Sequence, residues 1–190
     1  HLDTPIDFDN LTAAGSMMGS GGLIVMDEDD CMVSVAKFFL EFTVEESCGK
    51  CSPCRIGNKR LHELLNHICE GKGSISDIDR LRNMSLVIKD TSLCGLGQTS
   101  PNPVLSTLDN FMDEYIAHVR DKKCPAGKCK DLMEYYIIPE NCVGCTACAR
   151  VCPVNAISGE RKEIHYINPE VCIKCGACKE KCKFDAIIIR

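Results

Sequence analysis

Four cysteines near the C-terminal end of the chain recur in a fixed spacing, and this repeat constrains the fold more than any other feature. The first copy reads Cys-x-x-Cys-x-x-Cys-x-x-x-Cys and comprises Cys142, Cys145, Cys148 and Cys152. The second copy, thirty residues later, comprises Cys172, Cys175, Cys178 and Cys182. Asn155-Ala156-Ile157 and Asp185-Ala186-Ile187 share the same offset, so the chain repeats one supersecondary unit.

Two runs with this spacing are the signature of a bacterial ferredoxin with two 4Fe–4S clusters, in which the fourth Cys of each run ligates the cluster of the other run. The spacing therefore assigns one cluster to Cys142, Cys145, Cys148 and Cys182, and the other to Cys152, Cys172, Cys175 and Cys178. Zinc is the alternative, since Cys-x-x-Cys pairs also bind it tetrahedrally. A zinc ion needs only four ligands, however, and leaves two complete runs unexplained.

The length and composition limit the class of protein. The chain has 190 residues, enough for one or two domains with real cores, and 16 of them are Cys. A disulfide scaffold is the alternative explanation for so many cysteines, but it is typical of small secreted proteins. We find neither a signal peptide nor an apolar run that could span a bilayer. We therefore expect reduced thiolates and a cytoplasmic location. The net charge of −5 argues against nucleic acid as a partner.

A second cysteine site is expected upstream. Three cysteines at two-residue gaps form a loop, Cys48-Gly-Lys-Cys51-Ser-Pro-Cys54, that lacks a fourth Cys nearby. Helical periodicity fills the stretch from residue 56 to residue 88, with a plausible capping box at 76–79, and Cys94 follows in another loop. Two antiparallel helices would return Cys94 to the first loop, so we expect a third 4Fe–4S cluster on Cys48, Cys51, Cys54 and Cys94.

These motifs carry a resemblance to a known family. Glu-Ser-Cys-Gly-Lys-Cys-Ser-Pro-Cys-Arg at 46–55, followed by Thr-Ser-Leu-Cys-Gly-Leu-Gly-Gln at 91–98, resembles the NADH-binding flavoprotein subunit of respiratory NADH:quinone oxidoreductase. With a two-cluster ferredoxin tail, the chain is more similar to the homologous subunit of NAD(P)-dependent, electron-bifurcating FeFe hydrogenases. Gly19-Ser20-Gly21-Gly22-Leu-Ile-Val-Met-Asp also fits the end of that family's ubiquitin-like domain.

The resemblance implies a function as well as partners. In the family, FMN and NADH bind a Gly-rich region earlier in the sequence, so we place no flavin or nicotinamide site on these residues. The chain begins with His1, and we expect it to be a fragment or a processed chain. The resemblance implies a relay of single electrons from FMN through three clusters, to or from soluble ferredoxin or a hydrogenase-type subunit, with a thioredoxin-like 2Fe–2S subunit as a further partner.

We expect an α+β architecture in four parts. Residues 1–30 are the end of a ubiquitin-like (SLBB) domain and a connector, with a short buried strand at 23–26. Residues 31–119 are a four-helix bundle with one cluster, 120–133 a linker, and 134–190 a two-cluster ferredoxin domain. In that domain we expect residues 135–138 to pair with 186–189, and residues 164–167 to pair with 156–158.

The linker carries Cys124 and Cys129, which lie outside the twelve cluster cysteines. With His118 they could form most of a zinc site at the junction between bundle and ferredoxin domain. The fourth ligand stays open in the sequence, with Cys69, His62 and His67 as the candidates. The alternatives are free thiols and a surface histidine. We expect Cys31, which stands alone, to be a small buried hydrophobic residue.

The chain contains no Ser-His-Asp set, no paired carboxylates and no phosphate loop, so we expect no catalytic residue in it. The prediction is an electron-transfer segment of an oxidoreductase complex. The alternatives are the same relay in an NAD-dependent formate dehydrogenase or a respiratory-type NADH dehydrogenase. From a different class, the rival is a zinc-stabilised binding module without a redox role.

Overall fold

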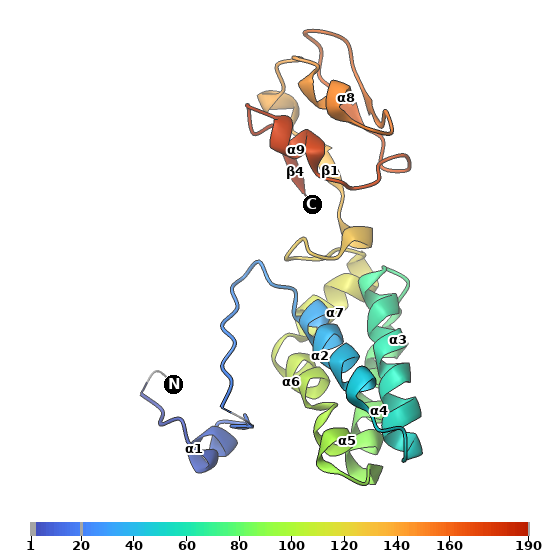
Figure 1. The fold of residues 1–190 in the computed structure, drawn as a ribbon. Helices are drawn as coiled ribbons and strands as arrows, with labels where there is room; N and C mark the ends of the chain where they lie inside the picture. The colour runs from blue at the N-terminus through green and yellow to red at the C-terminus, as the bar shows by residue number, and fades with distance from the viewer. Residues whose placement is uncertain (1–2, 20, 190) are drawn as a thin grey trace.

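The structure, a computed structural model, describes residues 3–19 and 21–189 and divides them into three parts (Figure 1). An extended N-terminal segment lies beside a compact group of helices, and a smaller unit built from short helices and strands stands at the end of that group. A segment around residues 120–133 joins the two. No helix among the described residues combines the length and the apolar character that crossing a membrane would take.

The N-terminal segment differs from the expectation. It contains one short helix, α1 (Phe8–Ala13), which Asp7 caps through its side chain. The stretch from Leu23 to Met26 is not a strand, and its side chains are exposed, with 85% of Val25 accessible. None of the described strands pairs with this stretch, so the apolar run is left open to solvent.

The helical part contains α2 (Met32–Glu46), α3 (Asn58–Cys69), α4 (Ile75–Thr91) and α6 (Asn102–Asn110), with two short helices, α5 (Gly95–Thr99) and α7 (Met112–Ile116). Each long helix buries one face. Val33, Ala36 and Leu40 of α2, for example, follow the helical repeat and are completely buried. They meet Leu61, Leu65, Leu81, Val104 and Leu108 in one core.

The last long apolar run of this region is divided between two helices. Phe111 leaves the helical conformation, with φ −132° and ψ 37°, so the apolar run from Val104 to Ile116 becomes α6 and α7. The region from residue 31 to residue 119 therefore contains short helices besides the four long ones. Two π-helical turns also occur in this part, Pro53–Gly57 and Ala117–Asp121, and such turns are frequent at functional sites.

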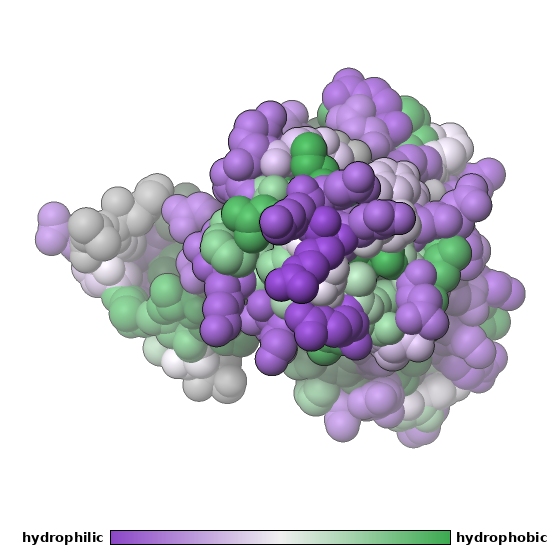
Figure 2. Space-filling model, turned by 90° about the horizontal axis from the view of Figure 1, so that it is seen from above, coloured by the Kyte–Doolittle hydropathy of each residue, from purple (hydrophilic) through white to green (hydrophobic). Residues whose placement is uncertain are grey.

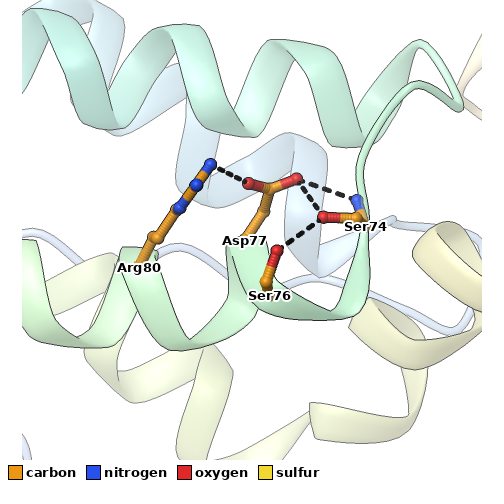
Figure 3. A network of polar contacts seen from close by, with 4 residues as sticks. All are labelled: Ser74, Ser76, Asp77 and Arg80. Atoms are coloured by element: carbon orange, nitrogen blue, oxygen red, sulfur yellow. Dashed lines mark hydrogen bonds and ion pairs between the residues drawn. The ribbon is translucent and has the colours of Figure 1, made fainter.

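The start of α4 shows how a helix boundary is defined here. Ser74, and not Ser76, is the N-cap residue, and Asp77 accepts a hydrogen bond from the Ser74 backbone N–H at 2.8 Å (Figure 3). Arg80 lies 3.1 Å from the other Asp77 oxygen. The capping box is therefore Ser74 with Asp77, and the prediction of Ser76 with Asp79 was wrong by two positions.

The C-terminal unit holds two small antiparallel sheets. Strand β1 (Tyr135–Ile137) pairs with β4 (Ile187–Ile189), and β2 (Ile157–Ser158) pairs with β3 (Tyr166–Ile167), which confirms both predicted pairings. Helices α8 (Ala147–Val151) and α9 (Ala177–Lys181) complete the two repeats. Two 3₁₀ turns, Lys130–Leu132 and Pro139–Asn141, lie in the approach to this unit.

The surface at this end of the molecule is mostly hydrophilic, with separate hydrophobic residues between the polar ones (Figure 2). Val143, Ile173 and Phe184, which flank the cysteine loops, are each about half exposed. A second core lies beneath them and includes the strand residues together with the buried cysteines Cys148 and Cys178.

Candidate metal centres

The first cysteine cavity of the C-terminal unit is lined by Cys142, Cys145, Cys148 and Cys182. Its empty volume is about 330 Å³, and its other lining side chains are mainly apolar. The loop that carries three of these cysteines turns through left-handed conformations at Gly144 and Thr146, with φ 66° and 63°. A Cβ at Gly144 would lie 2.5 Å from the Glu163 backbone nitrogen, so this loop requires glycine there.

The second cavity is lined by Cys152, Cys172, Cys175 and Cys178, with an empty volume of about 310 Å³. Both cavities have four cysteines in their lining, so they suit ligands of the same kind. The structure thus brings together the two groups of four that the crossed assignment formed, each with three cysteines from one repeat and one from the other. Backbone N–H groups point at the sulfurs, as in the 3.2 Å contact from Ala156 to Cys152 Sγ.

The bundle site is built from two loops at one end of the helices. Cys54 is buried in the π-helical turn before α3, while Cys48 and Cys94 are exposed. A Cβ at Gly97 would lie 2.6 Å from Ser92 Oγ and 3.2 Å from Cys54 Cβ, so the loop that carries Cys94 packs directly on Cys54. The pKa of Cys51 is lowered, mainly by a hydrogen bond from the Leu93 backbone. A lowered pKa favours the thiolate form of this cysteine.

A buried amide supports Cys54. The Asn58 side chain is completely buried, and its Nδ2 donates to Cys54 Sγ at 3.5 Å. Ser100 Oγ donates to Asn58 Oδ1 at 2.8 Å and thereby orients the amide. Ser47 Oγ lies 3.3 Å from the same sulfur. These contacts place donors around the sulfur, as expected for the surroundings of a ligating thiolate.

A fourth group of ligand-type residues lies where the bundle meets the linker. Cys31, His118, Cys124 and Cys129 are all buried, and their ligand atoms lie within 4.8 Å of one another. Among the residues that the structure describes, no other set of three or more His, Cys, Asp or Glu is this close.

The distances in this group match a tetrahedral zinc site. Zn–S bonds of about 2.3 Å and Zn–N bonds of about 2.0–2.1 Å place two sulfurs about 3.8 Å apart, and sulfur and nitrogen about 3.5 Å apart. Cys31 Sγ lies 3.8 Å from Cys129 Sγ, and His118 Nε2 lies 3.3 Å and 3.4 Å from these two sulfurs. Four protein ligands that complete the coordination sphere are typical of a structural zinc site, and they leave no position for a substrate.

Hydrogen bonds around these side chains favour the protonation states that can bind a metal ion. His118 Nδ1 donates to the Glu114 carbonyl oxygen at 2.7 Å, which leaves the lone pair on Nε2 for a metal ion. Cys31 is the N-cap residue of α2, so its sulfur accepts from the Ser34 backbone N–H at the positive end of a helix dipole. Hydrogen bonds with Cys129 and Cys31 lower the pKa of Cys124, the direction that a thiolate ligand needs.

The structure adds one residue to the predicted group and leaves out its three other candidates. Cys31, expected to be a buried hydrophobic residue without ligands nearby, is buried but supplies the fourth ligand-type atom. The candidates His62, His67 and Cys69 are not members of the group, although Cys69 lies close enough for a hydrogen bond with Cys129 to lower its pKa. The sequence signal that could have drawn attention to Cys31 is its position directly before the apolar helical repeat of α2, at the N-cap.

Comparisons with known proteins agree with this geometry. Residues 34–118 match the "NADH-ubiquinone oxidoreductase-F iron-sulfur binding region", and residues 135–158 and 165–188 each match the "4Fe-4S binding domain". The NADP-reducing hydrogenase subunit HndC of Solidesulfovibrio fructosivorans is 65% identical over 187 residues, which cover 98% of this chain and 38% of that protein.

More distant relatives match a shorter part. The F-type subunit of the NADH-quinone oxidoreductase of Mycobacterium bovis is 43% identical over 66% of this chain, and that of Streptomyces coelicolor is 42% identical over the same share. The chain spans 38% of the length of the hydrogenase subunit and 28% of each of these two relatives. A chain of an NAD+-reducing nickel–iron hydrogenase is similar over 50% of this chain and 17% of its own, at 29% identity and a TM-score of 0.49.

Proposed function

Because this chain comprises an iron–sulfur region of the NADH-ubiquinone oxidoreductase-F family followed by paired 4Fe-4S binding repeats, we propose that it relays single electrons within an NAD(P)H-dependent oxidoreductase. The observation that carries the proposal is the pair of cavities that are each lined by three cysteines of one repeat and one of the other. Bound 4Fe–4S clusters supply one-electron chemistry at such sites.

The proposal assigns twelve cysteines to three clusters. The bundle site uses Cys48, Cys51, Cys54 and Cys94, and the C-terminal sites use Cys142, Cys145, Cys148 and Cys182, and Cys152, Cys172, Cys175 and Cys178. The protein's own part is to hold these thiolates, to direct N–H groups at their sulfurs, and to bury Cys54, Cys148 and Cys178 away from water. Burial raises the pKa of Cys178 to about 11, so assembly of its site must displace a proton.

Anaerobic iron and acid-labile sulfide analysis of the reconstituted chain tests this assignment. Three clusters require about twelve irons and twelve sulfides per chain. Serine in place of Cys94 is expected to remove about four irons, whereas serine in place of Cys69 is expected to leave the iron content unchanged. Zinc without sulfide would instead support the rival function, a zinc-stabilised binding module.

We also propose that Cys31, His118, Cys124 and Cys129 bind one structural zinc ion. Cys31 and His118 belong to the bundle, while Cys124 and Cys129 belong to the linker, so the ion would fasten the linker to the bundle. The agreement of the sulfur and nitrogen distances with tetrahedral geometry supports this assignment. Elemental analysis should find one zinc per chain in addition to the iron.

The names of the relatives support a choice of host complex. The name of the most extensively matched relative cited above, an NADP-reducing hydrogenase subunit, favours a hydrogenase over a formate dehydrogenase or a respiratory NADH dehydrogenase. In the whole protein, FMN and NAD(P)H would bind outside this chain. The clusters would pass electrons to or from soluble ferredoxin or a hydrogenase-type subunit, with a thioredoxin-like 2Fe–2S subunit in the same complex. Hydrogen-dependent reduction of NADP by the purified complex tests this choice.

We propose a separate role for each of four segments of the chain. Residues 1–30 connect to the rest of the protein, 31–119 hold the first cluster, 120–133 form the fastened linker, and 134–190 carry the paired clusters. The short contacts between linker and C-terminal unit support this division, among them the hydrogen bond from Lys174 Nζ to the Asp131 carbonyl oxygen at 2.8 Å.

A further inference from the structure

The internal repeat places two different polar side chains in equivalent positions. With the offset of thirty residues, β1 corresponds to the stretch that ends in β3, and Tyr135 corresponds to His165. Tyr135 lines the cavity of Cys152, Cys172, Cys175 and Cys178, and His165 lines the cavity of Cys142, Cys145, Cys148 and Cys182. Most other lining residues correspond as apolar pairs, such as Ile137 with Ile167 and Ala186 with Ala156.

Tyr135 brings a hydrogen-bond donor to its cavity. The side chain is buried, with 8% of the residue exposed, and a Cβ at Gly176 would lie 3.1 Å from the hydroxyl oxygen. Gly176 belongs to the cysteine loop, so the absence of a side chain lets the phenol come close to the loop backbone. The phenol carries one O–H donor, which this close approach brings to the cysteine loop.

His165 brings no comparable donor. The residue is 2% exposed, and its Nδ1 lies 3.1 Å from the Glu163 carbonyl oxygen, which can only accept. The ring proton of a neutral His165 is therefore on Nδ1. Nε2 is buried without a hydrogen-bond partner, and in this tautomer it carries a lone pair. The loop position that corresponds to Gly176 is Thr146, whose side chain occupies the equivalent place.

We propose that this difference gives the two C-terminal clusters different reduction potentials, the one held by Cys152, Cys172, Cys175 and Cys178 being the higher. The inference rests on the proposed function, since it presupposes both clusters. A one-electron reduction adds negative charge to a cluster, and donors directed at its sulfurs stabilise the reduced form. Tyr135 supplies such a donor on one side, whereas neutral His165 supplies none on the other.

A second difference acts in the same direction. Lys174 lies in the loop between Cys172 and Cys175, where the first loop has Gly144. Its ammonium group donates to the Asp131 carbonyl oxygen at 2.8 Å and its backbone N–H donates to Cys172 Sγ at 3.4 Å, so the second loop carries a positive charge that the first loop lacks. Positive charge also favours the reduced form of a cluster. Electrons that enter the unit would therefore collect on the cluster next to the linker loop that contains Asp131.

The test is a potentiometric titration of the full chain, followed by electron paramagnetic resonance, after iron and sulfide analysis of each variant. Tyr135→Phe should lower one midpoint potential and leave the others in place. One neutral hydrogen bond corresponds to about a threefold to tenfold change in the reduction equilibrium, and tenfold is about 59 mV for one electron. Tyr136→Phe, the neighbouring phenol on the other face of β1, is the matched control.

His165→Tyr combined with Thr146→Gly is the reciprocal variant and should raise a different midpoint potential, because it adds the missing donor together with the glycine that lets a phenol approach the loop. If Tyr135→Phe loses iron, this second variant still decides the question. Full iron and sulfide content with unmoved midpoints, or both variants acting on the same cluster, would overturn the inference. A wild-type chain without about twelve irons would instead reject the proposed function itself.

Discussion

His118 Nε2 lies 3.3 Å from the sulfur of Cys31, although 87 positions separate the two residues in the chain. Both side chains are buried, with 0% and 1% exposed, and both belong to the bundle. The contact joins the start of α2 to the π-helical turn Ala117–Asp121. It therefore forms the fixed half of the proposed zinc site, to which the linker contributes Cys124 and Cys129.

Serine in place of Cys31 should remove this zinc. We expect the affinity to fall by more than about 100-fold, because loss of a direct ligand exceeds the effect of an outer hydrogen-bond partner. Elemental analysis after dialysis against a chelator measures the loss. Cys69→Ser is the matched control, since Cys69 is also buried near Cys129 but lies outside the group of four. Equal zinc retention in both variants would contradict the assignment.

Gly144→Ala should damage the first C-terminal site alone. A Cβ there would lie 2.5 Å from the Glu163 nitrogen and 2.6 Å from its carbonyl oxygen, and backbone atoms cannot move aside cheaply. We expect the iron content to fall from about twelve to about eight per chain. Gly127→Ala is the control, because Gly127 shares the left-handed conformation, with φ 61°, but its Cβ would meet only Ile189 at 3.6 Å. Iron loss in both variants would point to strain and not to the clash.

Asn58→Ala should destabilise the bundle and alter its cluster. The substitution leaves the Ser100 hydroxyl without the Asn58 acceptor and Cys54 without an amide donor. We expect about 1–3 kcal/mol less stability in urea unfolding and a lower midpoint potential for the bundle cluster. Asn110→Ala serves for comparison, since the Asn110 amide donates to the Ser106 carbonyl oxygen at the exposed surface. An unchanged potential would show that the amide acts on stability alone.

Asp77→Ala should weaken the capping box at the start of α4 and cost about 1 kcal/mol at neutral pH. Burial raises the pKa of Asp77, but hydrogen bonds from Ser74 and the charge of Arg80 outweigh it and hold the pKa below its ordinary value of 3.8. The Asp77 contribution is therefore present above pH 3.8 and is lost as the pH falls through the lowered pKa of the folded state.

Urea unfolding followed by circular dichroism at neutral and acidic pH measures this contribution. The difference between wild type and Asp77→Ala should shrink at the acidic end. Asp79→Ala removes the same charge two positions later, at an exposed residue outside the capping box, and should have a smaller effect. A difference that stays constant with pH would contradict the role of the Asp77 carboxylate.

The spacing of the cysteines was sufficient to predict the local parts of the sites. Three cysteines at two-residue gaps with a left-handed residue between them form a loop through their own backbone, so Cys142, Cys145 and Cys148 lie at one cavity as expected. The 3.6-residue periodicity from residue 56 to residue 88 likewise predicted α3 and α4, and the β-rich runs at 135–138 and 186–189 predicted the pairing of β1 with β4.

Contacts between distant segments depended on the tertiary structure. Cys31 had no neighbouring cysteine to mark it, and only the packing of α2 on the rest of the bundle brings it to His118. The run Leu23–Met26 has the composition of a strand, but none of the described strands pairs with it. The sequence alone thus determined which residues could be ligands and how the local loops turn, because spacing acts within a few residues. Packing decided that Cys31 and His118, 87 positions apart, lie in contact. It also decided which cavity Tyr135 lines and which cavity His165 lines. These contacts exist only when the cores have formed.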